Sequence, residues 1–387
     1  MHQVVIAGIG QTAVGEKWDL SLRELAFFAL ENAMNDAGGL RPQALYLANM
    51  LGPALSHQSH MGTLVADFAG LQGIEAFSVE AAGASGGAAL RLAYLAVASG
   101  AVGTAIAVGV EKMSDQTVSN VGAAEATLTD SDYEAEHGLT PTAQAALLMR
   151  RYIHEYNPPD FAFGGFPVLA HKNGATNPNA MFQKAIKPEL YQRVGMVAEP
   201  LNMFDAAPAA DGSAAVILTR PELLPKQFAH PLVQITGSSI VVDTLALHDR
   251  PDPLIFNAAR LSAARALEMA GKTNADIDLF ELFDAYSIYA ALTLEAAGFA
   301  QPGAGWQLTN DGTLELDGKL PILTFGGCKA RGNPGGATGL YQAVEAALQL
   351  RGDAGANQVQ NAQTALIQAL GGPASTAASH VFERINA

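Results

Sequence analysis

The feature that most constrains the fold is a unit of strand, glycine-rich turn and long helix that occurs twice along the chain. The first copy, "SVEAAGASGGAALRLAYLAVASG", spans residues 78–100, and the second, "PILTFGGCKARGNPGGATGLYQAVEAALQL", spans residues 321–350. Their turns match closely, since Gly83-Ala-Ser-Gly-Gly-Ala-Ala resembles Gly332-Asn-Pro-Gly-Gly-Ala-Thr. A repeat whose period exceeds half the chain predicts an internal duplication.

Strand-like and helix-like segments alternate over most of the sequence. Residues 4–10, "VVIAGIG", are typical of a strand, and residues 21–39 are typical of an amphipathic helix with a serine cap and a glycine end. This alternation predicts an α/β fold with a mainly parallel sheet covered by helices. Residues 115–200 lack strand periodicity and are richer in Asn, Pro, Tyr and His. We expect an N-terminal half (1–114), an inserted cap over a shared site (115–200) and a C-terminal half (201–387).

Charge and cysteine content exclude several classes of function. The chain has 22 basic and 37 acidic residues, a net charge of −15, and no basic run interleaved with aromatic residues. Nucleic acids and anionic membranes are therefore not expected as partners. The single cysteine, Cys328, excludes an internal disulfide and a multi-cysteine metal site, and it suits a reducing cytoplasm. His57 and His60 have no third ligand beside them, so no metal is expected.

Seven segments occur in a specific order along the chain: "SVEAAGASGGAAL", "VGVEKM", "HKNGATNPNAMF", "DGSAAVIL", "ELFDAYSIYAALTLEAAGF", "GGCKARGNPGGATGLYQ" and "ALGGPASTAASHVF". In these segments the chain resembles the thiolase superfamily over essentially its whole length, and it is most similar to the branch of sterol-carrier-protein-type and archaeal acetoacetyl-CoA thiolases. The resemblance implies two duplicated halves of αβαβα type, and acyl-CoA C-acyltransferase activity of the acetyl-CoA acetyltransferase kind. It also implies a coenzyme A ester as substrate or ligand and no permanently bound cofactor.

The residues that the family uses for catalysis are replaced in this sequence. The resemblance places the nucleophilic cysteine at Gly83, a histidine or asparagine at Phe283, and a catalytic histidine at Asn333. The cysteine or histidine that precedes the last Gly-Gly corresponds to Gln368. Four changes together favour a natural change of role over one engineered inactivation. Because thioester exchange needs a thiolate, we expect no covalent acyl-enzyme.

Backbone N–H groups can still donate hydrogen bonds although the family's catalytic side chains are absent. Gly83 and Gly372 are predicted to offer N–H groups as an oxyanion hole, although both glycines are equally compatible with tight packing alone. The carboxamide of Asn333 can donate a hydrogen bond to a thioester oxygen but cannot act as a base at neutral pH.

Three side chains are candidates for acid–base work. His137 lies where some thiolase-fold acyltransferases place a working histidine, and the alternative is a loop histidine that caps the next helix. Asp284 and Tyr286 follow the strand "DLFELF", at the end where ligands bind in α/β sheets. Thiolase-fold aldolases use tyrosines in place of cysteine and histidine, which makes retro-aldol cleavage an alternative. Phe283 and Asn333 depart from that pattern, and a core role for Tyr286 stays open.

Two classes of function follow. In the first, the protein is an enzyme that acts on a CoA ester by retro-aldol cleavage or non-covalent acyl transfer. In the second, it is a catalytically silent subunit that binds acyl-CoA or stabilises an active partner. The resemblance also implies a homodimer or dimer of dimers through residues 76–83, "AFSVEAAG", and a possible small zinc-ribbon and OB-fold partner.

Overall fold

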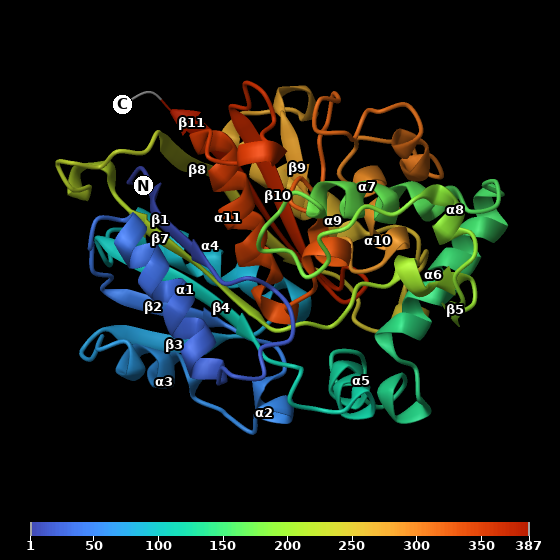
Figure 1. Cartoon of the computed structure of the whole chain (residues 1–387), viewed down its shortest axis with the longest axis horizontal. Helices are drawn as coiled ribbons and strands as arrows, with labels where there is room; N and C mark the ends of the chain where they lie inside the picture. Colours follow the sequence, from blue (N-terminus) through green and yellow to red (C-terminus); the bar gives the residue numbers. More distant parts are fainter. Residues whose placement is uncertain (1, 386–387) are drawn as a thin grey trace.

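The computed structural model describes residues 2–385, which fold around a mixed nine-stranded sheet (Figure 1). The strand order is β3-β2-β4-β7-β1-β8-β11-β10-β9. The two halves of the sheet meet where β1 pairs with β8 through Val5 and Gln234. The nine strands are β1 (Val5–Gln11), β2 (Ala44–Ala48), β3 (Glu75–Val79), β4 (Thr104–Glu111), β7 (Gly212–Thr219), β8 (Leu232–Val242), β9 (Leu279–Glu281), β10 (Thr364–Gly371) and β11 (Thr376–Ile385). A separate small pair joins β5 (Met196–Ala198) and β6 (Leu201–Asn202).

The α/β class is confirmed, but the prediction of a mainly parallel sheet is wrong. Only the β2–β3, β2–β4 and β9–β10 pairs are parallel, and the other five pairs of the large sheet are antiparallel. One cause is that β11 follows β10 through a tight turn at residues 372–375, with no crossover helix between them. The other is that β7 enters from the inserted region and runs antiparallel to both β1 and β4.

The repeated unit forms the centre of the molecule. Helices α4 (Ser85–Ala98) and α11 (Thr338–Arg351) each follow a short 3-10 turn, η1 (Ala82–Ala84) and η10 (Gly335–Ala337), and pack against each other. A Cβ at Gly86 would lie 2.8 Å from the Leu340 nitrogen, so only glycine allows this close crossing. The outer faces carry α1 (Leu22–Asp36) on the N-terminal half and α9 (Asn257–Ala270) and α10 (Ser287–Ala296) on the C-terminal half (Figure 1).

The region predicted as a cap is helical. It contains α5 (Val118–Ala126), α6 (Pro141–Tyr156), α7 (Gly165–Gly174) and α8 (Pro188–Tyr191), drawn in green beside the sheet in Figure 1. Strand β7, which a boundary at residue 201 assigns to the C-terminal half, pairs with the N-terminal strands β1 and β4. Two shorter helices, α2 (Gly52–Leu55) and α3 (Met61–Phe68), complete the N-terminal half. No helix within residues 2–385 is long and apolar enough to cross a membrane.

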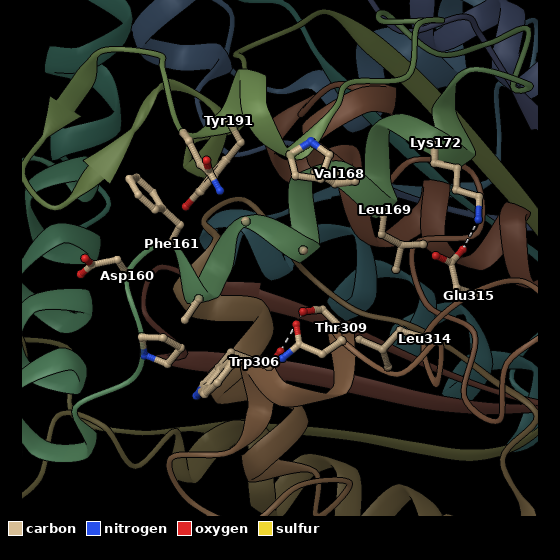
Figure 2. Close-up of a pocket in the computed structure, with 18 residues that line it drawn as sticks. Asp160, Phe161, Val168, Leu169, Lys172, Tyr191, Trp306, Thr309, Leu314 and Glu315 are labelled. Atoms are coloured by element: carbon tan, nitrogen blue, oxygen red, sulfur yellow. Dashed lines mark hydrogen bonds and ion pairs between the residues drawn. The ribbon is translucent and has the colours of Figure 1, made fainter.

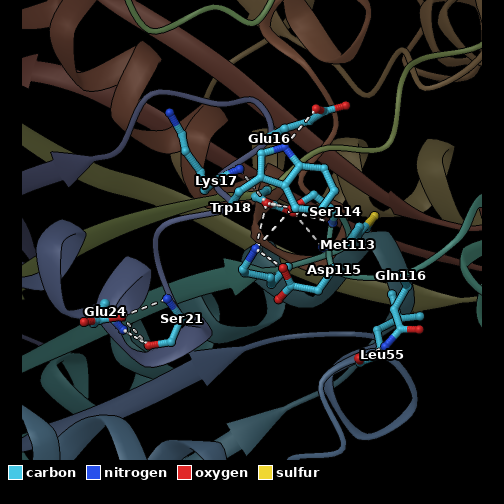
Figure 3. Close-up of polar contacts among 12 residues, drawn as sticks. Glu16, Lys17, Trp18, Ser21, Glu24, Leu55, Met113, Ser114, Asp115 and Gln116 are labelled. Atoms are coloured by element: carbon cyan, nitrogen blue, oxygen red, sulfur yellow. Dashed lines mark hydrogen bonds and ion pairs between the residues drawn. The ribbon is translucent and has the colours of Figure 1, made fainter.

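A buried carboxylate fixes the junction between cap and sheet. Asp211, just before β7, is fully buried and accepts hydrogen bonds from the backbone nitrogens of Met113 (2.6 Å), Ser114 (2.9 Å) and Lys17 (2.9 Å). Figure 3 shows Lys17, Met113 and Ser114 close together, and it also shows the Ser21–Glu24 capping box that begins α1. The chain therefore leaves β4 for the cap along a defined path.

We expect the chain to form at least a dimer through β3, and light scattering at micromolar concentration measures this. β3 ends the sheet, so its outer edge is unpaired within the described residues, and Phe77 on this strand is 43% exposed. Exposed strand edges pair readily with a second copy. Phe77→Asp is expected to shift the mass towards a monomer, whereas Ile255→Asp, at a similarly exposed position of the C-terminal half, is not. A monomeric wild-type chain would contradict this prediction.

Candidate functional site

The turns of both halves and two cap helices line one open cavity of about 130 Å³. From the sheet side, Gly83, Phe283, Asn333 and Gly372 line it, so the structure brings four of the sequence-predicted positions together. From the cap side, residues of α5 and α6 close it. The remaining lining residues are mainly small or apolar side chains: Met50, Leu128, Thr129, Pro141, Ala206, Ala207, Ala209, Ala285 and Gly335.

The turn at Gly83 has no room for a side chain. A Cβ built there would lie 2.6 Å from the carbonyl oxygen of Leu370 and 3.0 Å from Cζ of Phe283. The backbone carbonyl belongs to strand β10 and cannot swing away as a flexible side chain would. The ring of Phe283, 6% exposed, thus packs against Gly83, the position where the sequence resemblance places the family's nucleophile.

Two backbone N–H groups at the cavity are free. The amides of Gly83 and Gly372 have no hydrogen-bond acceptor among residues 2–385. Gly372 has a φ of +56° in the turn between β10 and β11, a conformation that glycine adopts without strain. Both residues line the cavity, so it contains two unused backbone donors.

Asn333 is held by three hydrogen bonds. Its nitrogen donates to the carbonyl of Pro208 (3.1 Å), and its carbonyl accepts from Ala210 (3.2 Å). Its side-chain Oδ1 accepts from Oγ1 of Thr338 at 3.0 Å, which assigns the donor nitrogen Nδ2 to the other side of the carboxamide. No described residue accepts from Nδ2, so a third donor is available at the cavity wall.

Two tyrosines of helix α10 form the phenolic part of the wall. Tyr286 caps the helix, and its hydroxyl pairs with Oγ1 of Thr142 on α6 at 2.9 Å. Tyr289 packs edge-on against Tyr286, with ring centroids 5.0 Å apart. Burial raises the pKa of both phenols, so both remain protonated near neutral pH and can donate but not accept a proton.

Glu125, which sequence reasoning missed, supplies the carboxyl group. The described residues that line the cavity include no histidine, cysteine, lysine or arginine, and Glu125 is their single carboxyl. Burial raises its pKa above the ordinary value. Helix α5 carries it in "VSNVGAAEA", where one acid among small residues is the signal that could have drawn attention.

Three candidates from the sequence do not reach the cavity. His137 ends the short helix η2 (Ala135–His137) and is exposed to solvent. Asp284 directly follows Phe283, points elsewhere, and accepts from the Cys328 nitrogen at 2.6 Å. Gln368 is buried in β10, where Nε2 donates to the Ala259 carbonyl at 2.9 Å. Asp284 and Gln368 therefore hold neighbouring segments together, and none of the three lines the cavity.

Cys328 is a packed thiol. It is 1% exposed, and burial together with nearby Asp284 raises its pKa above the ordinary range, so a thiolate does not form near neutral pH. Within residues 2–385, no three His, Cys, Asp or Glu side chains gather as metal ligands.

A larger hollow of about 450 Å³ lies elsewhere on the cap (Figure 2). Phe161, Tyr191 and Trp306 contribute aromatic rings, and Lys172 pairs with Glu315 across 2.5 Å at its rim. None of the glycine-turn residues line this hollow. It is therefore separate from the cavity that the two halves share.

Comparisons with known proteins agree with the architecture. Residues 4–222 match the family model "Thiolase, N-terminal domain", and residues 239–384 match "Thiolase C-terminal domain-like". An acetyl-CoA acetyltransferase of Methanothermobacter thermautotrophicus is 40% identical, covering 99% of this chain and 100% of the relative. The 17-hydroxy-3-oxo-4-pregnene-20-carboxyl-CoA lyase of Mycobacterium tuberculosis is 29% identical over 95% of this chain and 96% of the relative. The solved Ltp2-ChsH2(DUF35) aldolase superposes with a TM-score of 0.83 at 26% identity, covering 99% of this chain and 98% of that one.

Proposed function

The chain belongs to the thiolase family, and from this premise we propose that it binds an acyl-CoA thioester and cleaves a carbon–carbon bond without a covalent acyl-enzyme. The reaction that the cavity supports best is retro-aldol cleavage of a 3-hydroxyacyl-CoA. One observation carries this proposal: the described residues that line the cavity include no thiol and no imidazole, yet they combine free backbone donors, a carboxyl group and protonated phenols.

The backbone donors fit the thioester oxygen. In a retro-aldol reaction, negative charge develops on this oxygen as the enolate forms, and fixed N–H groups stabilise such charge. The amides of Gly83 and Gly372 supply two donors, and Nδ2 of Asn333 supplies a third. None of the three needs the missing cysteine.

Glu125 and Tyr286 divide the proton transfers. The Glu125 carboxylate takes the proton of the 3-hydroxyl, C3 becomes a carbonyl carbon, and the bond between C2 and C3 breaks. Its electron pair passes to C2 and the thioester oxygen as an enolate. Tyr286 then protonates C2, and the protonated Glu125 restores the phenol. The products are an aldehyde or ketone and a shortened acyl-CoA, and no other reactant is consumed. A carboxyl whose pKa burial raises is a stronger base than an exposed one.

The printed names of relatives support this choice of reaction. One relative of nearly equal length is named a CoA lyase, and a superposable solved structure is titled an aldolase. That title also names a second component, ChsH2(DUF35), which supports a partner protein for this chain. We propose that this partner is a small zinc-ribbon and OB-fold protein. We propose a cytoplasmic protein with acyl-CoA as its ligand.

A catalytically silent subunit is the second candidate. It is favoured by the same absence of thiol and imidazole among the described lining residues, because binding needs only the donors and the apolar wall. In this case the chain would bind acyl-CoA or stabilise an active partner.

A panel of 3-hydroxyacyl-CoA and 3-oxoacyl-CoA esters, incubated with and without free CoA and followed by mass spectrometry, tests these proposals. Retro-aldol cleavage consumes a 3-hydroxyacyl-CoA without free CoA and yields a carbonyl product. Acyl transfer instead consumes a 3-oxoacyl-CoA only when CoA is present. Saturable binding without turnover would favour the silent subunit. The absence of both binding and turnover would refute the enzyme and the acyl-CoA-binding subunit, and would leave only the stabilisation of an active partner.

Gly83→Cys is expected to produce no thiolysis of 3-oxoacyl-CoA. The new Cβ would meet the Leu370 carbonyl oxygen at 2.6 Å, and the family's histidine positions still hold Phe283 and Asn333. In the wild type, iodoacetamide or acyl-CoA should leave no adduct on residues 78–90. Ser85 cannot substitute, since its Oγ accepts from the Ala81 nitrogen at 2.9 Å and donates to the Ala82 carbonyl at 2.6 Å. Peptide mapping checks this, and an acyl group on Ser85 would contradict it.

A further inference from the structure

Two polar side chains at the cavity have no partner. Gln144 on α6 is 1% exposed, and neither its Oε1 nor its Nε2 forms a hydrogen bond within the described residues. Tyr289 on α10 is 2% exposed, and its hydroxyl is likewise unpaired. Both residues line the cavity. Leaving a buried amide unpaired is unfavourable, so such groups are normally satisfied by a neighbour, an ordered water or a ligand.

The unpaired side chains of Gln144 and Tyr289 indicate which chemical group a bound ligand would present to them. The carboxamide offers a donor at Nε2 and an acceptor at Oε1, while the phenol of Tyr289 stays protonated because burial raises its pKa. A ketone or ether oxygen would satisfy the donors and leave Oε1 empty. A hydroxyl satisfies both ends, since it accepts from Nε2 or the phenol and donates to Oε1.

The size of the cavity limits what carries this hydroxyl. Its volume is about 130 Å³. An apolar protein cavity of about 150 Å³ holds a benzene ring. The polar side chains of the wall are those of Gln144, Tyr289, Tyr286, Glu125, Asn333 and the two threonines, and the rest of the wall is apolar or backbone. The space beside Gln144 and Tyr289 therefore suits a single ring or a short branched chain.

We propose that the acyl group of the ligand is ring-sized and bears a hydroxyl that Gln144 and Tyr289 recognise. This inference rests on the proposed function, since it places the acyl part of a CoA ester in the shared cavity. It names a specificity-determining pair, Gln144 on α6 and Tyr289 on α10. Neither helix carries one of the positions that the resemblance assigns to the family's catalytic residues.

Equilibrium binding of benzoyl-CoA and its 2-, 3- and 4-hydroxybenzoyl counterparts tests the proposal by calorimetry. These esters lack a 3-hydroxyacyl chain, so they bind without retro-aldol turnover. One hydroxy isomer is expected to bind at least about 10-fold more tightly than benzoyl-CoA, the effect of satisfying one buried polar group. Equal affinities for all four esters would overturn the inference, and would mean that solvent already satisfies Gln144.

Two variants identify the recognising groups. Gln144→Met keeps a similar length without polar atoms, and it should reduce the preference for the hydroxy isomer to about 3-fold or less while benzoyl-CoA binds no worse. Tyr289→Phe should reduce the preference partly, whereas Tyr94→Phe, a buried tyrosine of α4 outside the cavity, should leave it unchanged. An undiminished preference in both cavity variants would refute the assignment. If none of the CoA esters binds, the proposed function is refuted together with this inference. This outcome therefore distinguishes failure of the proposed function from failure of the inference alone.

Discussion

Replacing Arg331 with methionine is expected to lower the free energy of unfolding by about 3–5 kcal/mol, the usual cost of removing one partner of a buried ion pair. Arg331 and Glu345 are both 1% exposed, and Nη1 lies 2.7 Å from Oε2. The guanidinium also stacks over the ring of Tyr341, 5.1 Å from its centroid. The variant leaves the Glu345 carboxylate buried without a counter-charge. Urea unfolding followed by circular dichroism measures the loss.

The loss of unfolding free energy in Arg331→Met should increase as pH rises. Burial raises the pKa of Glu345, while Arg331 opposes that rise. Burial and neighbouring Glu345 raise the pKa of Glu281 to about 8, from an ordinary 4.5. Groups with a raised pKa in the folded state stabilise it fully below their ordinary pKa, and lose this contribution as pH rises through the folded value. Without Arg331, the carboxyl groups of Glu281 and Glu345 keep their protons to higher pH. The loss of unfolding free energy in Arg331→Met should therefore be smaller near pH 5 than near pH 8.

Two control variants distinguish the loss of the buried ion pair from the general loss of one positive charge. Arg151→Met breaks the 2.7 Å pair with Glu155, whose side chains are 49% and 45% exposed. Exposed pairs contribute at most about 1 kcal/mol, so this variant should unfold almost like the wild type. Arg331→Lys keeps the positive charge and should lose less than Arg331→Met. Equal losses in Arg331→Met and Arg151→Met would contradict the assignment.

The duplicated unit could be predicted from sequence because its signals are local. The glycine turns at Gly83 and Gly335 and the amphipathic pattern after them identify two helices, and the structure places α4 and α11 there with equal lengths of 14 residues. Strand direction could not be predicted in the same way. The pairing of β7 with β1 and β4 joins segments some 200 and 100 residues apart, and no local pattern records which way a returning strand runs.

The cavity was predictable on its sheet side and not on its cap side. Gly83, Asn333 and Gly372 sit at the ends of strands or in turns, where α/β proteins bind ligands, and the structure brings them together. Side-chain direction was harder, because a shift of one residue along a strand turns a side chain to the opposite face. Asp284 and Gln368 both point into structure rather than into the cavity.

Glu125 and Gln144 escaped prediction because their role depends on how α5 and α6 fold over the sheet. Neither residue lies in a motif of the family segments, and each is separated from Gly83 by more than forty residues of chain. Tertiary packing alone makes one the cavity's carboxyl group and leaves the other unpaired. The inserted region thus supplies the polar groups that the glycine turns have lost.

Glu125→Gln is expected to lower kcat for cleavage of the 3-hydroxyacyl-CoA by about 10²- to 10⁴-fold, the usual effect of removing a general base. Glutamine keeps the size and the hydrogen-bonding reach of the side chain, so KM should change little. The wild-type rate should rise with pH through the pKa of Glu125, which burial holds above its ordinary value, because the base must be deprotonated. The variant should lose this rise. Steady-state kinetics across a pH series measures both effects.

Matched variants distinguish loss of a base from disturbance of the cap. Glu136→Gln and His137→Ala alter exposed residues of the same inserted region that lie outside the cavity, and both should retain wild-type kcat. Tyr286→Phe removes the proposed donor to C2 and should lower kcat by about 10²-fold while the pH rise assigned to Glu125 persists. A wild-type kcat in Glu125→Gln would exclude it as the base. Loss of activity in His137→Ala alone would instead return the proton transfer to the loop histidine, and would require the cap to close further over the cavity than it does here.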